Sequence, residues 1–189
     1  MGPDRCTVRI ALLSFCALLL SACAQLPEQP VELAVSGDFE LAGRVAIKNA
    51  GDGASGNITW RHSRDADDVF ITSPIGQGIA RITRAGDRAR LVTADGKSFE
   101  ANDAEALTEQ VLGWRLPLAG LPDWVQARPV AGGSAAVIGK NAAGQVSEIR
   151  QSGWRMEYLA WRDDLPSRIT FGRDTLEIRL LIDRWVLPP

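Results

Sequence analysis

The chain has 189 residues, a length that suits one domain of ordinary size with a sizeable core. Apolar residues make up 46%, charged residues 23% and the formal net charge is −2, which argues against a disordered chain and against a nucleic-acid partner. After the first two dozen residues, no stretch is apolar for long enough to predict a membrane-spanning helix.

Residues 1–22 have the pattern of a bacterial lipoprotein signal peptide. Arg5 and Arg9 form a short basic region, and an apolar run follows from Ile10 to Leu20. The run ends in Ser21-Ala22-Cys23, the small residues and cysteine of a lipobox. An ordinary signal peptide with an incidental cysteine is the alternative, but the order of these features favours lipidation at Cys23.

Cysteine usage agrees with lipidation. Cys6, Cys16 and Cys23 are the three cysteines of the chain, so removal of residues 1–22 leaves one thiol, at the first mature residue. Acyl chains on it would anchor the protein, at ~0.8 kcal/mol per buried CH₂. We therefore predict no disulfide, no thiolate metal site and no cysteine nucleophile. By the sorting rule of enteric bacteria, in which Asp at the next position retains a lipoprotein in the inner membrane, Ala24 favours the outer membrane.

Residues 23–37 are expected to form a tether and residues 38–189 a single domain. From Phe39 to Lys48, apolar and polar residues alternate with the period of a half-buried strand. Further strands are expected at 57–62, 69–72, 79–83, 88–93 and 97–101, separated by turns rich in Gly and Asp. Short strands at this regular spacing indicate an antiparallel meander.

A helical pattern follows. Asn102 or Asp103 is the expected N-cap of a helix that Gly113 ends, and Pro122 to Gln126 forms a second, shorter helix. Strands resume at 135–140, 146–150, 154–158, 168–171 and 176–180. We predict a mainly β protein with some α: a strongly curved antiparallel sheet that forms an unclosed barrel, covered by short helices and enclosing an apolar cavity.

Catalytic candidates are poor, and we predict no enzyme. His62 is the only histidine and is expected to be a solvated residue at a strand end. The adjacent carboxylates Asp67-Asp68 and Asp163-Asp164 are expected in turns, where turn chemistry explains them. A hydrolase with unrecognised residues stays open as an alternative.

The tryptophans are more informative. All six lie in the mature domain, and their size and rigidity suit the wall of an apolar cavity. Strand parity fixes faces only within one strand, so the inward face is left open. The residues that we expect to line the cavity are Trp60, Trp124, Trp154, Tyr158, Ile47 and Met156.

Several short motifs follow one another along the mature chain. They are Phe39-x-Leu41-x-Gly43-Arg44-Val45-Ala46-Ile47, Ser73-Pro74-Ile75-Gly76-Gln77, Leu112-Gly113-Trp114-x-Leu116-Pro117-Leu118, Gly153-Trp154-x-Met156-x-Tyr158 and Asp183-Arg184-Trp185. Their order and spacing resemble the LolB family, the outer-membrane lipoprotein receptors of Gram-negative bacteria. Departures are Ile75, where Leu is usual, and Ala127, where the family often has Gly.

The resemblance implies a non-catalytic transfer protein without a cofactor. It would accept the acyl chains of lipoproteins from the periplasmic carrier LolA and insert the lipoproteins into the outer membrane. We expect a monomer that faces the periplasm. A structural or scaffold lipoprotein of the envelope, whose tryptophans simply fill a core, is the alternative. The role of Arg44, in a carrier contact or in barrel closure, is left open.

Pro74 and Gly76 are turn residues, so Ile75 between them stands at the tip of a hairpin, where a polar residue is usual. Near an outer membrane, an exposed apolar side chain at this place suggests insertion into the inner leaflet of the membrane. We predict that Pro74, Ile75 and Gly76 form a membrane-insertion loop that helps acyl chains leave the cavity. The alternative is that Ile75 folds back onto the core.

Overall fold

The computed structural model describes residues 37–112, 115–116, 118–132 and 136–187. The predicted signal peptide, Cys23, all but the last residue of the predicted tether, and Trp114 lie outside these ranges. Within the described ranges, no helix is long and apolar enough to span a membrane.

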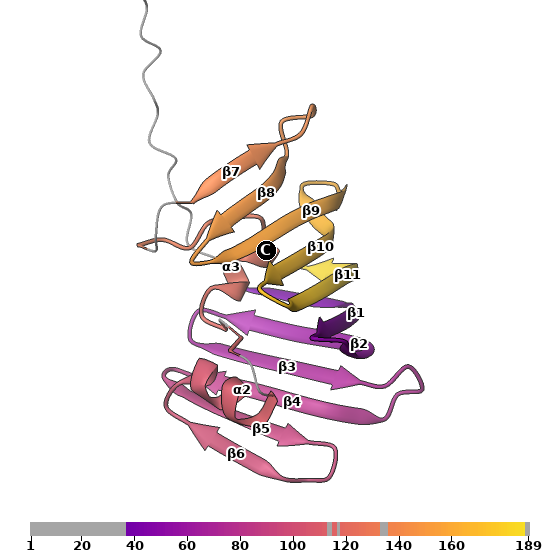
Figure 1. Cartoon of the computed structure of the whole chain (residues 1–189), viewed down its shortest axis with the longest axis vertical. Helices are drawn as coiled ribbons and strands as arrows, with labels where there is room; N and C mark the ends of the chain where they lie inside the picture. The colour runs from indigo at the N-terminus through magenta and orange to yellow at the C-terminus, as the bar shows by residue number, and fades with distance from the viewer. Residues whose placement is uncertain (1–36, 113–114, 117, 133–135, 188–189) are drawn as a thin grey trace, which may run out of the picture. The chain divides into compact units, whose positions relative to one another are not determined.

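One antiparallel sheet of eleven strands organises the domain (Figure 1). The strands are β1 (Phe39–Asn49), β2 (Asp52–Ser63), β3 (Ala66–Thr72), β4 (Gly78–Ala85), β5 (Arg88–Thr93), β6 (Ser98–Ala101), β7 (Val137–Lys140), β8 (Val146–Gln151), β9 (Trp154–Arg162), β10 (Leu165–Arg173) and β11 (Leu176–Val186).

The strand order is β6-β5-β4-β3-β2-β1-β11-β10-β9-β8-β7. Strands that follow each other in the chain pair, except β6 and β7, and β1 and β11 pair with each other in the middle of the sheet. In this order β6 and β7 are the two edges, so the sheet is an unclosed barrel. The predicted fold class is confirmed.

Side chains alternate between the two faces of the sheet, and one face is apolar. We call it the inner face; it carries buried residues such as Leu41, Trp60, Val69, Ile169 and Ile182. The opposite, outer face carries most of the charged side chains. Burial of one face fixes the pairing register, because a shift by one residue would turn the apolar set to water.

Two short helices are described, and each buries apolar side chains. In α2 (Ala104–Leu112), which contacts β5 and β6, Leu107 is fully buried. In α3 (Leu121–Val125), Trp124 and Val125 are buried. As predicted, Asp103 caps α2, because its Oδ1 accepts a hydrogen bond from the backbone N–H of Glu105 at 2.9 Å.

The strands are longer than the sequence predicts. β2 begins at Asp52, before the expected start at residue 57, and β9 runs to Arg162, beyond the expected end at residue 158. Residues such as Gly53 and Gly56 have low intrinsic strand propensity, but they pair with Lys48 and Val45 of β1. Pairing with a neighbouring strand therefore outweighs local preference here.

Candidate functional site

An apolar cavity lies on the inner face, beneath a segment that does not belong to the sheet. We call this segment, Leu116 and Leu118–Val125, the cover segment. The cavity has a volume of about 80 Å³. It is lined by Val45, Ile47, Ile58, Trp60, Val69, Ile71, Ile82, Leu116, Leu118, Leu121, Val125, Phe171, Ile178 and Leu180. Because every lining residue is apolar, the cavity suits hydrocarbon and not a polar ligand.

Two of the six residues expected at the cavity, Trp60 and Ile47, line it. The other four, Trp124, Trp154, Met156 and Tyr158, are buried but do not appear in its wall. Whether any of the six contacts an acyl chain stays a prediction.

Instead, three of these four residues hold α3 against the sheet. The Tyr158 hydroxyl donates to the Trp124 carbonyl at 2.7 Å, and Trp124 Nε1 donates to Oε1 of Gln151 at 3.0 Å. The rings of Trp124 and Trp154 lie 6.2 Å apart. Burial raises the pKa of Tyr158 far above its ordinary value, so its hydroxyl stays a donor. These contacts position Leu121 and Val125 over the cavity.

Sequence reasoning missed most of the cavity wall, although one signal could have found part of it. Trp60 pairs with Val69, and Val69 pairs with Ile82, so all three point to the same face. Hairpin register carried from Trp60 would have identified the other two residues. The cover segment has no strand periodicity, and its contribution depends on the tertiary fold.

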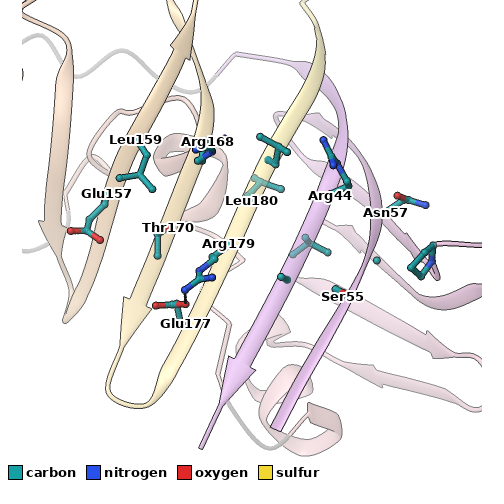
Figure 2. Close-up of a pocket in the computed structure, with 15 residues that line it drawn as sticks. Arg44, Ser55, Asn57, Glu157, Leu159, Arg168, Thr170, Glu177, Arg179 and Leu180 are labelled. Atoms are coloured by element: carbon teal, nitrogen blue, oxygen red, sulfur yellow. Dashed lines mark ion pairs between the residues drawn. The ribbon is translucent and has the colours of Figure 1, made fainter. Parts of the chain in front are cut away.

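A larger hollow, of about 640 Å³, lies on the outer face of β9, β10, β11, β1 and β2 (Figure 2). Arginine and glutamate side chains lie among its lining residues: Arg179 pairs with Glu177 at 2.7 Å, and Arg44 pairs with Asp183 at 3.2 Å. Such a charged, water-exposed hollow does not shelter hydrocarbon. We therefore take the smaller, apolar cavity as the candidate site. Arg44 bridges β1 and β11 on the outer face, and any role of Arg44 in a carrier contact stays open.

The tip loop, Ser73–Gln77, is tied at its base by hydrogen bonds. The N–H of Ser73 donates to the Gln77 carbonyl at 2.7 Å, and the N–H of Gly76 donates to the Ser73 carbonyl at 2.9 Å. Gly76 has a φ of 88°, a conformation that favours glycine. Ile75 is 83% exposed, so it does not fold back onto the core.

His62 and Asp67 correct two sequence predictions. His62 is buried at the end of β2 and not solvated, and Asp67 is buried in β3 and not in a turn. The turn between these strands takes only Arg64 and Asp65, so Asp67 pairs with His62 across the hairpin. His62 Nδ1 lies 2.7 Å from Asp67 Oδ1.

Two further donors reach the Asp67 carboxylate. Oδ1 accepts from Nε1 of Trp60 at 2.9 Å, and Oδ2 accepts from Nε of Arg84 at 2.6 Å. Burial by itself raises the pKa of Asp67, but the hydrogen bonds from His62, Trp60 and Arg84 outweigh it and lower that pKa below 3.8. The network thus links β2, β3 and β4 through an ionised carboxylate. Among the described residues, no group of three or more His, Cys, Asp or Glu could hold a metal ion.

Comparison with known proteins agrees with these features. Residues 37–185 match the family described as "Outer membrane lipoprotein LolB". The outer-membrane lipoprotein LolB of Azoarcus sp. is 40% identical over 184 residues, covering 94% of each chain. That of Thiobacillus denitrificans is 36% identical over 186 residues, covering 96% of this chain and 99% of its own.

Among solved structures, a LolA superfamily protein from Nitrosomonas europaea superposes with a TM-score of 0.49 at 8% identity, covering 82% of this chain and 88% of its own. The assignment rests on the sequence comparisons and not on this likeness. The chain belongs to the LolB family of lipoproteins, and it is a lipid-anchored protein of the outer membrane.

Proposed function

We propose that the protein accepts the acyl chains of lipoproteins from the periplasmic carrier LolA and releases the lipoproteins into the outer membrane without catalysis. The wholly apolar cavity beneath the cover segment is the observation that carries this proposal. An acyl chain needs an apolar environment away from water, and the cavity wall from Val45 to Leu180 offers one.

The cavity enlarges when a chain enters. Its volume of about 80 Å³ lies well below the roughly 300–1,000 Å³ of pockets that bury a whole ligand. Four lining residues, Leu116, Leu118, Leu121 and Val125, belong to the cover segment. Displacement of this segment opens the cavity without breaking the strand pairing of the sheet.

Transfer then follows a graded series of affinities. A tenfold preference for this protein over the carrier requires only ~1.4 kcal/mol. The bilayer binds the acyl chain more strongly than either protein, because burial in the bilayer contributes ~0.8 kcal/mol per CH₂ of the chain. No step of this series requires a nucleotide or a cofactor.

Ile75 acts at the release step. The tip loop presents this side chain almost fully to solvent. Burial of an isoleucine side chain contributes about 1.5–3 kcal/mol, enough for a reversible contact with the bilayer and too little for an anchor. The contact brings the cavity next to the membrane while the acyl chains leave.

The Ile75→Glu substitution tests this proposal. We expect the variant to fold and to take lipoprotein from the carrier, but to lose most incorporation into phospholipid vesicles, because a carboxylate resists entry into hydrocarbon. Incorporation is measured as the fraction of lipoprotein that floats with the vesicles. Leu159→Glu is the matched control, because Leu159 is 60% exposed on a different strand, β9. Normal incorporation by the Ile75 variant would contradict the proposal.

A further inference from the structure

Exposed apolar side chains gather on one hairpin. Among the described residues, seven large apolar side chains are exposed: Phe70, Ile75, Ile79, Ile138, Leu159, Val186 and Leu187. Three of them, Phe70, Ile75 and Ile79, belong to the β3–β4 hairpin, residues 66–85. The loop of this hairpin extends beyond the neighbouring turns of the sheet, at the right of Figure 1. Ile75 alone therefore does not account for the exposed apolar surface here.

Strand parity places Phe70 and Ile79 together on the outer face. Val69 and Ile82 point inward from the same strands and are buried, so Phe70 and Ile79 point outward. Phe70 pairs with Arg81, which makes Ile79 its diagonal neighbour. The Phe70 ring covers Gly78, since a Cβ built there would lie 3.5 Å from two ring atoms. The apolar surface thus continues from the tip loop onto the outer face.

The charges that border this surface are paired. Arg81 donates to both carboxylate oxygens of Asp68, at 2.9 and 2.7 Å. Arg90 lies 3.6 Å from Glu100 and donates to Ser98 Oγ at 2.9 Å. Two positive and two negative side chains leave this border without net charge. Such a surface fits the headgroup boundary of a zwitterionic bilayer better than an anionic partner.

The tether is long enough for the lipid anchor and this hairpin to meet one membrane. The 14 residues 23–36 span at most about 46–50 Å when fully extended. Phe39 pairs with His62, and Asn57 lies next to the tip loop, where its Nδ2 donates to the Ser73 carbonyl. The five residues from 57 to 62 correspond to about 17 Å of strand. The anchor therefore reaches the plane of the tip loop with length to spare.

We infer that the outer face of the β3–β4 hairpin is a second membrane contact: Phe70 and Ile79 enter the interface of a zwitterionic phospholipid bilayer after Ile75. The domain then rests on the membrane along the hairpin and not on the tip alone. This inference builds on the membrane contact proposed for Ile75. It adds an orientation, in which the outer face of β3 and β4 turns toward the lipid while β9 stays in water.

Depth-dependent quenching tests the orientation. The mature lipidated protein has no other thiol, so single cysteines at positions 70, 75, 79 and 159 can carry a fluorophore in phosphatidylcholine vesicles with brominated acyl chains. We expect quenching at 70, 75 and 79 and none at 159. Quenching at 75 alone overturns the inference and leaves the proposed function standing. Absence of quenching at all four positions contradicts both.

A transfer assay tests the consequence. The double substitution Phe70→Ser with Ile79→Ser should reduce the rate of incorporation about tenfold, because two partly exposed apolar side chains no longer enter the interface. Transfer from the carrier should stay unchanged. The double substitution Leu159→Ser with Ile138→Ser is the matched control, since it removes two exposed apolar side chains elsewhere. Unchanged incorporation by the hairpin variant would overturn the inference, as would a change in oligomeric state that accounts for its loss.

Discussion

The carboxylate of Asp67 joins three strands through side-chain contacts. His62 and Trp60 reach it from β2, and Arg84 reaches it from β4. Its side chain is 6% exposed, so the charge depends on these partners and not on water. The network supports the inner wall, because Trp60 also lines the cavity.

Asp67→Asn should lower the free energy of unfolding by about 3 kcal/mol, because it leaves the partly buried Arg84 without its charge partner. Urea unfolding at neutral pH measures this loss. Asp68→Asn is the control: Asp68 and Arg81 are more exposed, so their pair should contribute no more than about 1 kcal/mol. Equal losses in the two variants would contradict this role of Asp67.

The wild type and the Asp67→Asn variant also allow a test of the pH dependence of stability. Because the folded-state pKa of Asp67 lies below its ordinary value of 3.8, the folded chain binds fewer protons than the unfolded chain there. The contribution of Asp67 is complete above the ordinary pKa and is lost as the pH falls through the lower, folded-state pKa. The difference in stability between the wild type and Asp67→Asn should therefore shrink as the pH falls below about 3.8. A difference that grows in acid would contradict this assignment.

At the scale of elements, the backbones of β2 and β3 leave no room for a side chain at Gly56, beside the tip loop. A Cβ added at Gly56 would lie 2.2 Å from the carbonyl oxygen of Thr72, the residue before Ser73. Asn57, the next residue, donates to the Ser73 carbonyl. The close backbone contact therefore helps to set the direction in which the tip loop leaves the sheet.

Gly56→Ala should destabilise the domain by about 1–3 kcal/mol, because the methyl group forces the two strands apart. Gly53→Ala on the same strand is the control, since its Cβ would meet the nearest atom at an ordinary 3.5 Å. Thermal or urea unfolding compares the two variants. If Gly56→Ala were as stable as Gly53→Ala, the close approach would not be a constraint in solution.

At the scale of the whole domain, the first strand, β1, pairs with the last strand, β11, in the middle of the sheet. β6 and β7 form the two edges. The cover segment, which includes α3, lies over the inner face and completes the cavity wall. This division suits the proposed acyl-chain transfer, because displacement of the cover segment would leave the hydrogen-bonded strands of the wall in place.

Ile47→Trp tests whether the cavity receives acyl chains. Ile47 lines the cavity from a half-buried position, so a larger side chain there should fill space without unfolding the domain. We expect the mature variant to bind an environment-sensitive fatty-acid probe about tenfold more weakly than the wild type does. Ile138→Trp on β7, an exposed position outside the cavity, is the control. Unchanged probe affinity, or a wild type that binds no probe, would favour the scaffold alternative.

Much of this organisation could be predicted from local sequence. Alternating apolar residues indicated the strands, Asp103 indicated the start of α2, and Pro74 with Gly76 indicated the tip loop, because each signal depends only on neighbours in the chain. His62 and Asp67 were misjudged for the same reason. A place at a strand end suggested solvent for His62, and adjacent carboxylates suggested a turn for Asp67. Only the pairing of β3 with both β2 and β4 brings donors around the carboxylate.

The sequence by itself determined the class of fold, the position of Ile75 at a turn and the resemblance to a lipoprotein receptor, because periodicity, turn chemistry and motif order can be read along the chain. The tertiary structure decided which residues line the cavity. Trp124, Trp154 and Tyr158 look like cavity residues from their size, yet they pack α3 in place. The tertiary structure also decided that Phe70 and Ile79 share one surface with Ile75, because strand register, and not residue type, sets which side chains become neighbours.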